Sequence, residues 1–170
     1  MPLIYRAATV AAAVFSLLAL AACDPQRISE LKEGVSTEAD VRDRFGAPEN
    51  VWDEPGGART FEYNRQPAGQ VNYMITIGAD GRMSALRQVL TPENFARVQP
   101  GQRMDAVRRL LGKPAKVTPY ELKKETHVDW RYLEGSNQAK VFTVVHGPDH
   151  VVLRTQTGAD LDAPEFKGGK

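Results

Sequence analysis

His146 and His150 come nearest, by residue type and spacing, to a chemical site in this sequence. They stand four residues apart with Asp149 between them, and on a helix this spacing would bring two metal ligands onto one face. The segment also contains Gly147-Pro148, and these residues favour a turn. We therefore predict a turn at this place and no metal site.

The remaining candidates for catalysis are few. His127 begins an expected strand, and the paired carboxylates Asp53-Glu54 precede the loop sequence Pro55-Gly56-Gly57, where acidic side chains are usually solvated. No Gly-x-Ser-x-Gly elbow, phosphate-binding glycine loop or His-Glu-x-x-His occurs in the sequence. We predict no catalytic residue, no metal, no cofactor and a function other than that of an enzyme.

The only cysteine, Cys23, follows an apolar leader. One charge, Arg6, precedes the apolar stretch from Ala7 to Ala22, and no acidic residue occurs before Asp24. A basic start, a short apolar run and small residues at its end are typical of a secretory signal. The run of about 16 residues is short for a membrane-spanning helix of roughly 20. Residues 1–22 are therefore predicted to be a signal peptide.

The segment Leu20-Ala21-Ala22-Cys23 resembles the bacterial lipobox. This resemblance implies cleavage between Ala22 and Cys23 and a diacylglycerol on the Cys23 sulfur, so that residues 23–27 become a lipidated tether. The alternative is an ordinary signal or a retained anchor with a free thiol. We expect a periplasm-facing protein held in the outer membrane. Asp24 resembles an inner-membrane retention signal of enteric bacteria, which keeps the inner membrane open as the alternative.

Composition narrows the class of protein. The chain has 170 residues, with 22 basic against 21 acidic side chains and 42% hydrophobic residues, as expected of a globular protein of one ordinary or two small domains. The near balance of charge argues against a nucleic-acid partner, which favours a basic face. A single cysteine excludes an intramolecular disulfide framework and a cysteine-rich zinc site.

Two segments of the sequence repeat each other. Val41 matches Val107, Gly46 matches Gly112 and Pro48 matches Pro114, all at an offset of 66 residues. Gly34 and Gly101 match at an offset of 67, and the aromatic pair Phe61 and Tyr63 resembles Trp130 and Tyr132. We predict one repeat over residues 28–90, a second over residues 91–157, and a flexible tail over residues 158–170.

Each repeat predicts two short helices followed by strands. Thr91-Pro92 reads as an N-cap before Pro at the first helical position, and Ser36 or Thr37 caps the second helix of the first repeat. The glycines end the helices, and Pro two residues later prevents their continuation. Alternating or β-branched residues then predict strands over 59–64, 70–77 and 83–90, and over 116–122, 126–133, 140–145 and 151–157.

The predicted fold class is α+β, with two tandem helix-helix-β-β-β repeats. A unit of about 60 residues buries only about 60% of its surface, so it is marginal alone. We therefore expect the two repeats to share one core or one extended antiparallel sheet packed by the short helices.

Aromatic residues on the expected strands are the candidates for binding a partner. They are Trp52, Phe61, Tyr63, Trp130 and Tyr132, with Arg65 beside them. Alternation puts Phe61 and Tyr63 on one face of a strand, and Trp130 and Tyr132 on one face of another. Buried aromatics dominate both cores and interfaces, so these residues either pack under the helices or dock a partner.

The repeated pattern of a short helix, Gly, a capped helix ending in Phe-Gly-x-Pro or Leu-Gly-x-Pro and an aromatic strand resembles the BamE (SmpA/OmlA) lipoprotein family. It equally resembles the β-lactamase inhibitor protein fold, which doubles the same unit. The first resemblance implies an envelope lipoprotein that binds proteins, as an accessory of the β-barrel assembly machinery or of envelope integrity. The alternative is a periplasmic inhibitor of a hydrolase that uses the doubled sheet as its docking surface.

Overall fold

The computed structural model describes residues 28–135 and 137–163. The predicted signal peptide, its cleavage site at Ala22 and Cys23, the tether and residues 164–170 of the predicted tail lie outside the described residues. No helix in the described ranges has the length and apolar character needed to span a bilayer.

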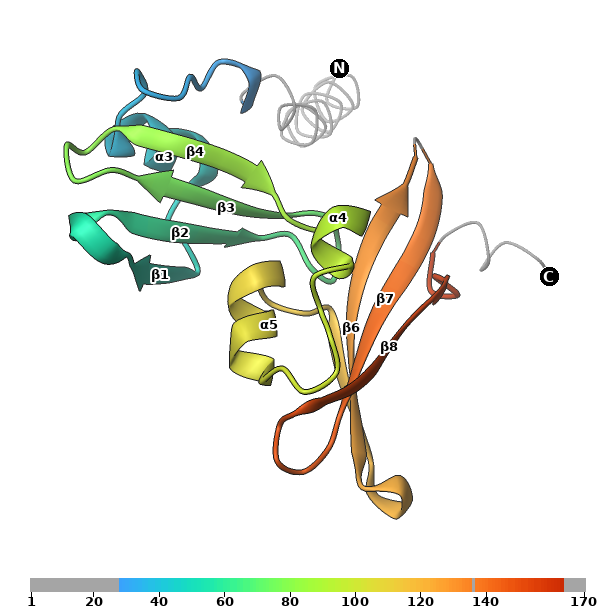
Figure 1. Ribbon diagram of the computed structural model, residues 1–170. Coiled ribbons are helices and arrows are strands. Elements are labelled where there is room, and N and C mark those ends of the chain that lie inside the picture. Colours follow the sequence, from blue (N-terminus) through green and yellow to red (C-terminus); the bar gives the residue numbers. More distant parts are fainter. Residues whose placement is uncertain (1–27, 136, 164–170) are drawn as a thin grey trace, which may run out of the picture.

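In the described part of the chain, eight strands form two antiparallel sheets (Figure 1). The first sheet has the order β1-β2-β3-β4 and the second has the order β5-β6-β7-β8. The strands are β1 (Asn50–Asp53), β2 (Arg59–Asn64), β3 (Asn72–Ile77), β4 (Met83–Gln88), β5 (Lys116–Tyr120), β6 (Glu125–Glu134), β7 (Gln138–His146) and β8 (Val152–Ala159). The α+β class is confirmed. The second repeat has the four strands that its sequence predicted, whereas the first repeat has four strands where three were predicted. β1 escaped prediction because it is only four residues long.

Short helices precede each sheet, as the repeat predicts. They are α3 (Glu38–Phe45) before the first sheet, and α4 (Pro92–Phe95) and α5 (Met104–Leu111) before the second. Two 3-10 turns, η1 (Pro55–Gly57) and η2 (Glu121–Lys123), connect β1 to β2 and β5 to β6. Thr37 caps α3, accepting from the Asp40 backbone N–H while the Asp40 carboxylate accepts from the Thr37 backbone N–H. Thr91 caps α4 in the predicted way, with Pro92 at the first helical position.

Backbone hydrogen bonds confirm the internal repeat. The Gly34 N–H donates to the Met83 carbonyl at 2.7 Å, and the Gly101 N–H donates to the Val152 carbonyl at 2.9 Å. In each repeat this bond joins the segment before the helix to the last strand of the sheet. A register shift also falls at matching places, between Thr76 and Ile77 in β3 and between Val145 and His146 in β7.

The aromatic strands match in a register that differs from the sequence alignment by two residues. Glu49 N–H donates to the Glu62 carbonyl, and Ala115 N–H donates to the Asp129 carbonyl, both at 2.8 Å. Glu62 is therefore equivalent to Asp129, and Tyr63 to Trp130. The sequence comparison matched Phe61 with Trp130 because both residues are aromatic. The structural counterpart of Phe61 is Val128.

The described residues form two hydrophobic clusters and two separate sheets, where we expected one shared core or one extended sheet. The first cluster contains Val41, Phe45, Phe61, Tyr63, Ile75, Ile77 and Met83, all from the first repeat. The second cluster lies between the second sheet and helices α4 and α5, and it includes Val107, Leu111, Trp130 and Phe142. Met74, Val89 and Leu90 of the first repeat join this second cluster, so the repeats share a core only in part.

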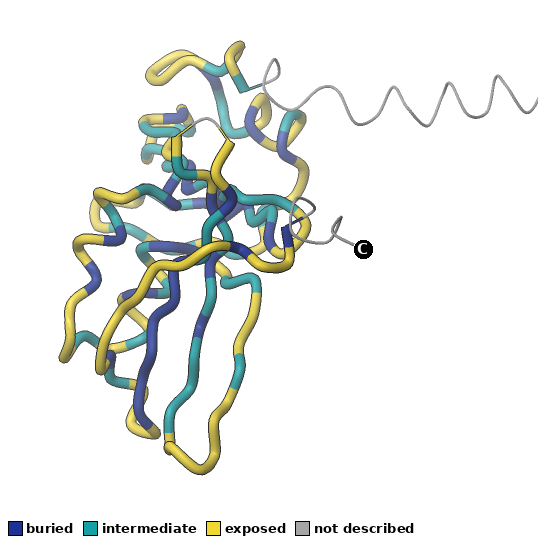
Figure 2. The backbone as a smooth tube through the Cα atoms, turned by 90° about the vertical axis from the view of Figure 1, so that its right-hand side faces the viewer, coloured by how far each residue is buried: buried dark blue, intermediate teal, exposed yellow. Residues whose placement is uncertain are grey.

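Helix α5 lies between the two sheets (Figure 1). Its buried residues Val107 and Leu111 pack in the second cluster. Its Arg108 contacts Glu62, which is on the face of the first sheet turned away from α3. The first sheet is thus covered on both faces, whereas much of the second sheet remains exposed (Figure 2).

Candidate functional site

Four of the predicted partner-binding aromatics belong to the hydrophobic core. Phe61, Tyr63, Trp130 and Tyr132 are all 2% exposed or less. The Tyr63 hydroxyl donates to the Gly46 carbonyl at 3.2 Å, and the Trp130 indole N–H donates to the Gly112 carbonyl at 2.9 Å. The core alternative therefore describes these residues, and their side chains are not available to a partner in this conformation.

The other two candidates do not form a common surface with them. Trp52 is half-buried on β1, with the Arg109 guanidinium of α5 5.6 Å from its ring centre. The half-buried Arg65 lies after β2, 5.8 Å from the ring centre of Phe45. The structure thus does not bring the six predicted residues together as one docking site.

The histidines form the predicted turn. The His150 N–H donates to the Gly147 carbonyl at 3.1 Å, and the rings of His146 and His150 lie 5.0 Å apart. His146 is buried, with its Nδ1 atom 2.7 Å from the Gly147 carbonyl oxygen. In the described ranges no group of three or more His, Cys, Asp or Glu could hold a metal ion.

The loop residue Glu54 forms an ion pair with helix α5. The Arg109 guanidinium of α5 lies 2.9 Å from the Glu54 carboxylate, and this contact lowers the pKa of Glu54. Arg109 also donates to the Asp53 carbonyl at 3.3 Å. The predicted solvated loop is therefore an attachment point between the first sheet and α5.

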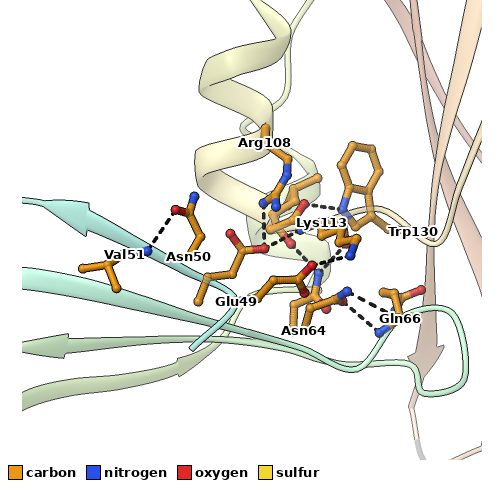
Figure 3. Close-up of polar contacts among 12 residues, drawn as sticks. Glu49, Asn50, Val51, Asn64, Gln66, Arg108, Lys113 and Trp130 are labelled. Carbon is orange, nitrogen blue, oxygen red and sulfur yellow. Dashed lines mark hydrogen bonds and ion pairs between the residues drawn. The ribbon is translucent and has the colours of Figure 1, made fainter. Parts of the chain in front are cut away.

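A buried polar junction fixes α5 against the first sheet (Figure 3). Glu62 is fully buried, accepts from the Lys113 N–H at 2.8 Å and pairs with the Arg108 guanidinium at 2.7 Å. The Asn72 side-chain amide donates to the carbonyls of Leu111 and Lys113 at 2.8 and 2.9 Å. These groups satisfy backbone atoms at the end of α5 that would otherwise be buried without partners.

A second polar contact joins the β2–β3 connection to the edge of β6. The Gln66 side-chain amide donates to the Arg131 carbonyl at 2.8 Å and accepts from the Arg131 N–H at 3.1 Å. Gln66 thereby pairs with the β6 backbone beyond the point where β5 begins. Sequence reasoning missed Glu62, Asn72 and Gln66 because they are ordinary polar residues whose partners lie 39 to 65 residues away.

The second sheet has a partly exposed face at the positions equivalent to this junction, on which Ala139, Thr143 and Val145 of β7 are buried. We call it the open face: the face of β5–β8 turned away from α4 and α5. Because cross-strand partners share a face, its residues follow from the register. They include Lys116, Thr118, Tyr120, Glu125, His127, Asp129, Arg131, Leu133, Val141, Thr143, Arg154 and Gln156. No helix of the described residues packs on this face.

A hollow of about 470 Å³ lies at the centre of the open face. Its floor is a row of four cross-strand partners, Lys116, Asp129, Thr143 and Gln156, and its rim includes Asp160 and Asp162. Asp129, the counterpart of Glu62, accepts from the Thr143 hydroxyl at 2.6 Å. The Arg131 guanidinium donates to the buried Asp160 carboxylate at 2.6 Å.

Paired charges and an aromatic ring line the end of the open face nearest the β5–β6 hairpin. Arg154 donates to both carboxylate oxygens of Glu125, at 2.7 and 2.8 Å. This bidentate contact is the main reason that the pKa of Glu125 falls to about 2. The half-buried His127 packs against Tyr120, with 4.4 Å between ring centres. The face thus offers aromatic, cationic and anionic groups that are already held in place.

Comparisons with known proteins add two similar structures. No family model and no curated protein matches the sequence. The DUF4309 family protein YjgB from Bacillus subtilis covers 80% of this chain and 86% of its own, at 23% identity and a TM-score of 0.32. A protein described as a "putative beta-lactamase inhibitor protein" from Streptococcus mutans is similar over 72% of this chain and 82% of its own chain, at 8% identity and a TM-score of 0.34. At such low scores neither carries a functional argument, and the BamE resemblance rests on the sequence motifs alone.

Proposed function

We propose that this protein is a non-catalytic, membrane-anchored binding module of the cell envelope, which docks a partner protein on the open face. The observation that supports this proposal is the difference between equivalent surfaces. The outer face of the first sheet is covered by α5 through Glu62 and Arg108, whereas the face around Asp129 has no such cover among the described residues.

The open face has the composition of a protein-binding surface. Tyr120 and Leu133 are 44% and 43% exposed and supply apolar contact area. Arginines and aromatics are the residues that dominate binding energies at interfaces. Because Arg131 and Arg154 are already held by Asp160 and Glu125, binding would cost less side-chain entropy than it would with free arginines.

The anchor is the lipid that we predict on Cys23. Ile28 is five positions after Cys23, and an extended chain spans at most about 3.5 Å per residue, so the start of the domain would stay within about 17 Å of its anchor. The partner is then an envelope protein at or near the same membrane, such as a component of the β-barrel assembly machinery. The outer membrane is the proposed address, with the inner membrane as the alternative because of Asp24.

Capture from membranes tests the docking surface. Full-length lipoprotein would be crosslinked in cells, purified in detergent and compared with the double variant Tyr120→Ala/Leu133→Ala. We expect the variant to lose about tenfold or more of the crosslinked envelope protein while keeping its thermal unfolding midpoint. Val35→Ala removes a comparably exposed apolar side chain from the first repeat and is the matched control. Equal capture by all three chains would contradict the proposal.

A second candidate function is inhibition of an envelope hydrolase. The β5–β6 hairpin projects from the body at the end remote from the blue start of the described chain (Figure 1), and Leu122 in this hairpin is fully exposed. Such a projection suits insertion into an enzyme cleft. Titration of periplasmic hydrolases with the full-length protein and with Leu122→Asp distinguishes the two functions. Inhibition by the parent but not by the variant would favour the inhibitor, and no inhibition at high concentration would exclude it.

A further inference from the structure

The four edge strands of the two sheets differ in how their free edges are protected. An exposed edge presents unpaired N–H and C=O groups that can pair with another chain. β1 has only four residues, and β5 contains Pro119, which lacks an N–H donor. On β4, the Glu33 carboxylate accepts from the outward-pointing Leu86 N–H at 3.0 Å. Three of the four edges are therefore short, interrupted or capped.

The edge of β8 has none of these devices. All residues from Leu153 to Ala159 are exposed, and this stretch contains neither Pro nor Lys (Figure 2). The Asp160 N–H donates to the Ala139 carbonyl, and this bond sets the alternation of the β7–β8 ladder. The backbone N–H and C=O groups of Thr155, Thr157 and Ala159 consequently point away from β7. None of these backbone groups has a hydrogen-bond partner among the described residues.

The repeat shows what is missing at this edge. Thr155 pairs with Val144 as Leu86 pairs with Ile75, so Thr155 is the counterpart of Leu86. Because Gly34 matches Gly101, the residue that corresponds to Glu33 is Pro100. Proline carries no side-chain acceptor, so the Thr155 N–H has no equivalent of the Glu33 cap.

We propose that β8 pairs antiparallel with β8 of a second copy of this chain, with Gln156 of one copy facing Gln156 of the other. In this register Thr155 faces Thr157 of the second copy, and their outward N–H and C=O groups bond to each other on both sides of the two-fold axis. Threonine pairs of this kind favour sheet formation. The arrangement is an isologous interface, with the same residues supplied by both copies.

The side chains of β8 are compatible with this register. Arg154 is the only charged side chain of the strand, it is held by Glu125, and it would face Gly158 of the second copy. Like charges therefore do not oppose each other, and Gly158 leaves room for the long side chain. Leu153 would face Ala159. The two second sheets would form one continuous sheet of eight strands, with their open faces side by side.

This inference stands apart from the proposed docking function, because it needs only the β8 backbone. Its first test is disulfide crosslinking of the full-length chain in detergent. Gln156→Cys places the two sulfurs opposite each other at a spacing that a disulfide accepts, whereas Thr157→Cys places them two residues out of register. We expect a covalent dimer for Gln156→Cys alone, with the parent chain as the control for Cys23. Failure of Gln156→Cys to crosslink, or equal crosslinking of Thr157→Cys, would overturn the proposal.

The second test is the molar mass of the full-length chain in detergent as a function of concentration. Thr157→Pro removes an outward N–H and leaves the β7–β8 ladder intact, and Thr157→Ala keeps that N–H as the matched control. We expect Thr157→Pro to raise the dissociation constant of the dimer about tenfold or more, and Thr157→Ala to change it little. A chain that stays monomeric at high concentration, or that dimerises equally well with Thr157→Pro, would overturn the proposal. So would amide exchange at Thr155 that is slowed only by adding cell extract, because the occupant would then be a foreign strand.

Discussion

Glu62 and Asp129 occupy equivalent positions in the two sheets, but their surroundings differ. Glu62 is fully buried beneath α5, where it pairs with Arg108, while Asp129 is half-buried at the floor of the hollow and accepts from Thr143. Helix α5 packs on the inner face of the second sheet, together with α4, and also on the outer face of the first sheet. No further helix of the described chain is left to cover the remaining face.

The helices show the same division of roles. Arg42 of α3 and Arg108 of α5 are equivalent, yet Arg42 pairs with Glu38 of its own helix while Arg108 reaches Glu62 on the neighbouring sheet. Of the two equivalent arginines, Arg108 therefore joins the two repeats, whereas Arg42 stays at the surface of the first repeat. Asp129, the counterpart of Glu62, lies on the open face, on which we propose that a partner binds.

The largest difference between the repeats is expected from their equivalent arginines. Arg108→Ala leaves the Glu62 carboxylate buried without its cation, so it should lower the free energy of unfolding by about 3–5 kcal/mol. Arg42→Ala removes an exposed pair with Glu38 and a contact with the Phe61 ring, and it should cost about 1 kcal/mol. Urea unfolding of both variants measures the two costs. Equal losses would show that the junction does not depend on the buried pair.

A smaller difference is expected from the glycines that end α3 and α5. Gly46 and Gly112 have φ of 81° and 77°, so alanine is strained at either site by about 1–3 kcal/mol. At Gly112 the new Cβ would also lie 2.9 Å from the Asn72 side chain, which holds the Leu111 and Lys113 carbonyls. Gly112→Ala should therefore cost about 2 kcal/mol more than Gly46→Ala in thermal unfolding. If the two variants unfold alike, Asn72 adapts and the junction is looser than described.

The smallest difference is expected at the turn before the last strand of each repeat. Gly81 and His150 are equivalent, since their carbonyls accept from the Glu38 and Met104 N–H groups, and their φ values are 76° and 57°. His150→Gly relieves the left-handed strain of a non-glycine residue but adds unfolded-state entropy, so it should stabilise by no more than about 1 kcal/mol. Gly81→Ala should destabilise by about 1 kcal/mol. Differential scanning calorimetry of the two variants measures whether each change stabilises or destabilises the protein. A destabilised His150→Gly chain would show that the His146–His150 ring contact outweighs the strain.

Much of the fold could be predicted because local signals carry it. Gly46, Gly112 and Thr37 act through their own backbone geometry and neighbouring residues, so the helix ends were predicted to within a residue or two. Strand β2 was predicted at its exact bounds because its residues alternate and lie between loop signals. The four-residue β1 is too short to show a period.

The candidate site was predicted less well, because burial decides it. Trp130 and Tyr132 have the residue types of an interface and of a core alike, and only packing against α4 and α5 separates the two. The predicted alignment of the aromatic strands was wrong by two residues because it rested on similar residue types. The equivalence of the strands is set by their hydrogen-bond pairing.

The sequence by itself determined the duplication, the helix ends and most of the strands, because these depend on residues that are close along the chain. Only the tertiary structure decided which face of which sheet is covered. That outcome depends on where α5 lies in space, and so on bonds such as those from Lys113 to Glu62 and from Asn72 to Leu111, which join residues far apart in sequence. A period in the sequence tells which side chains share a face, but not what packs against it.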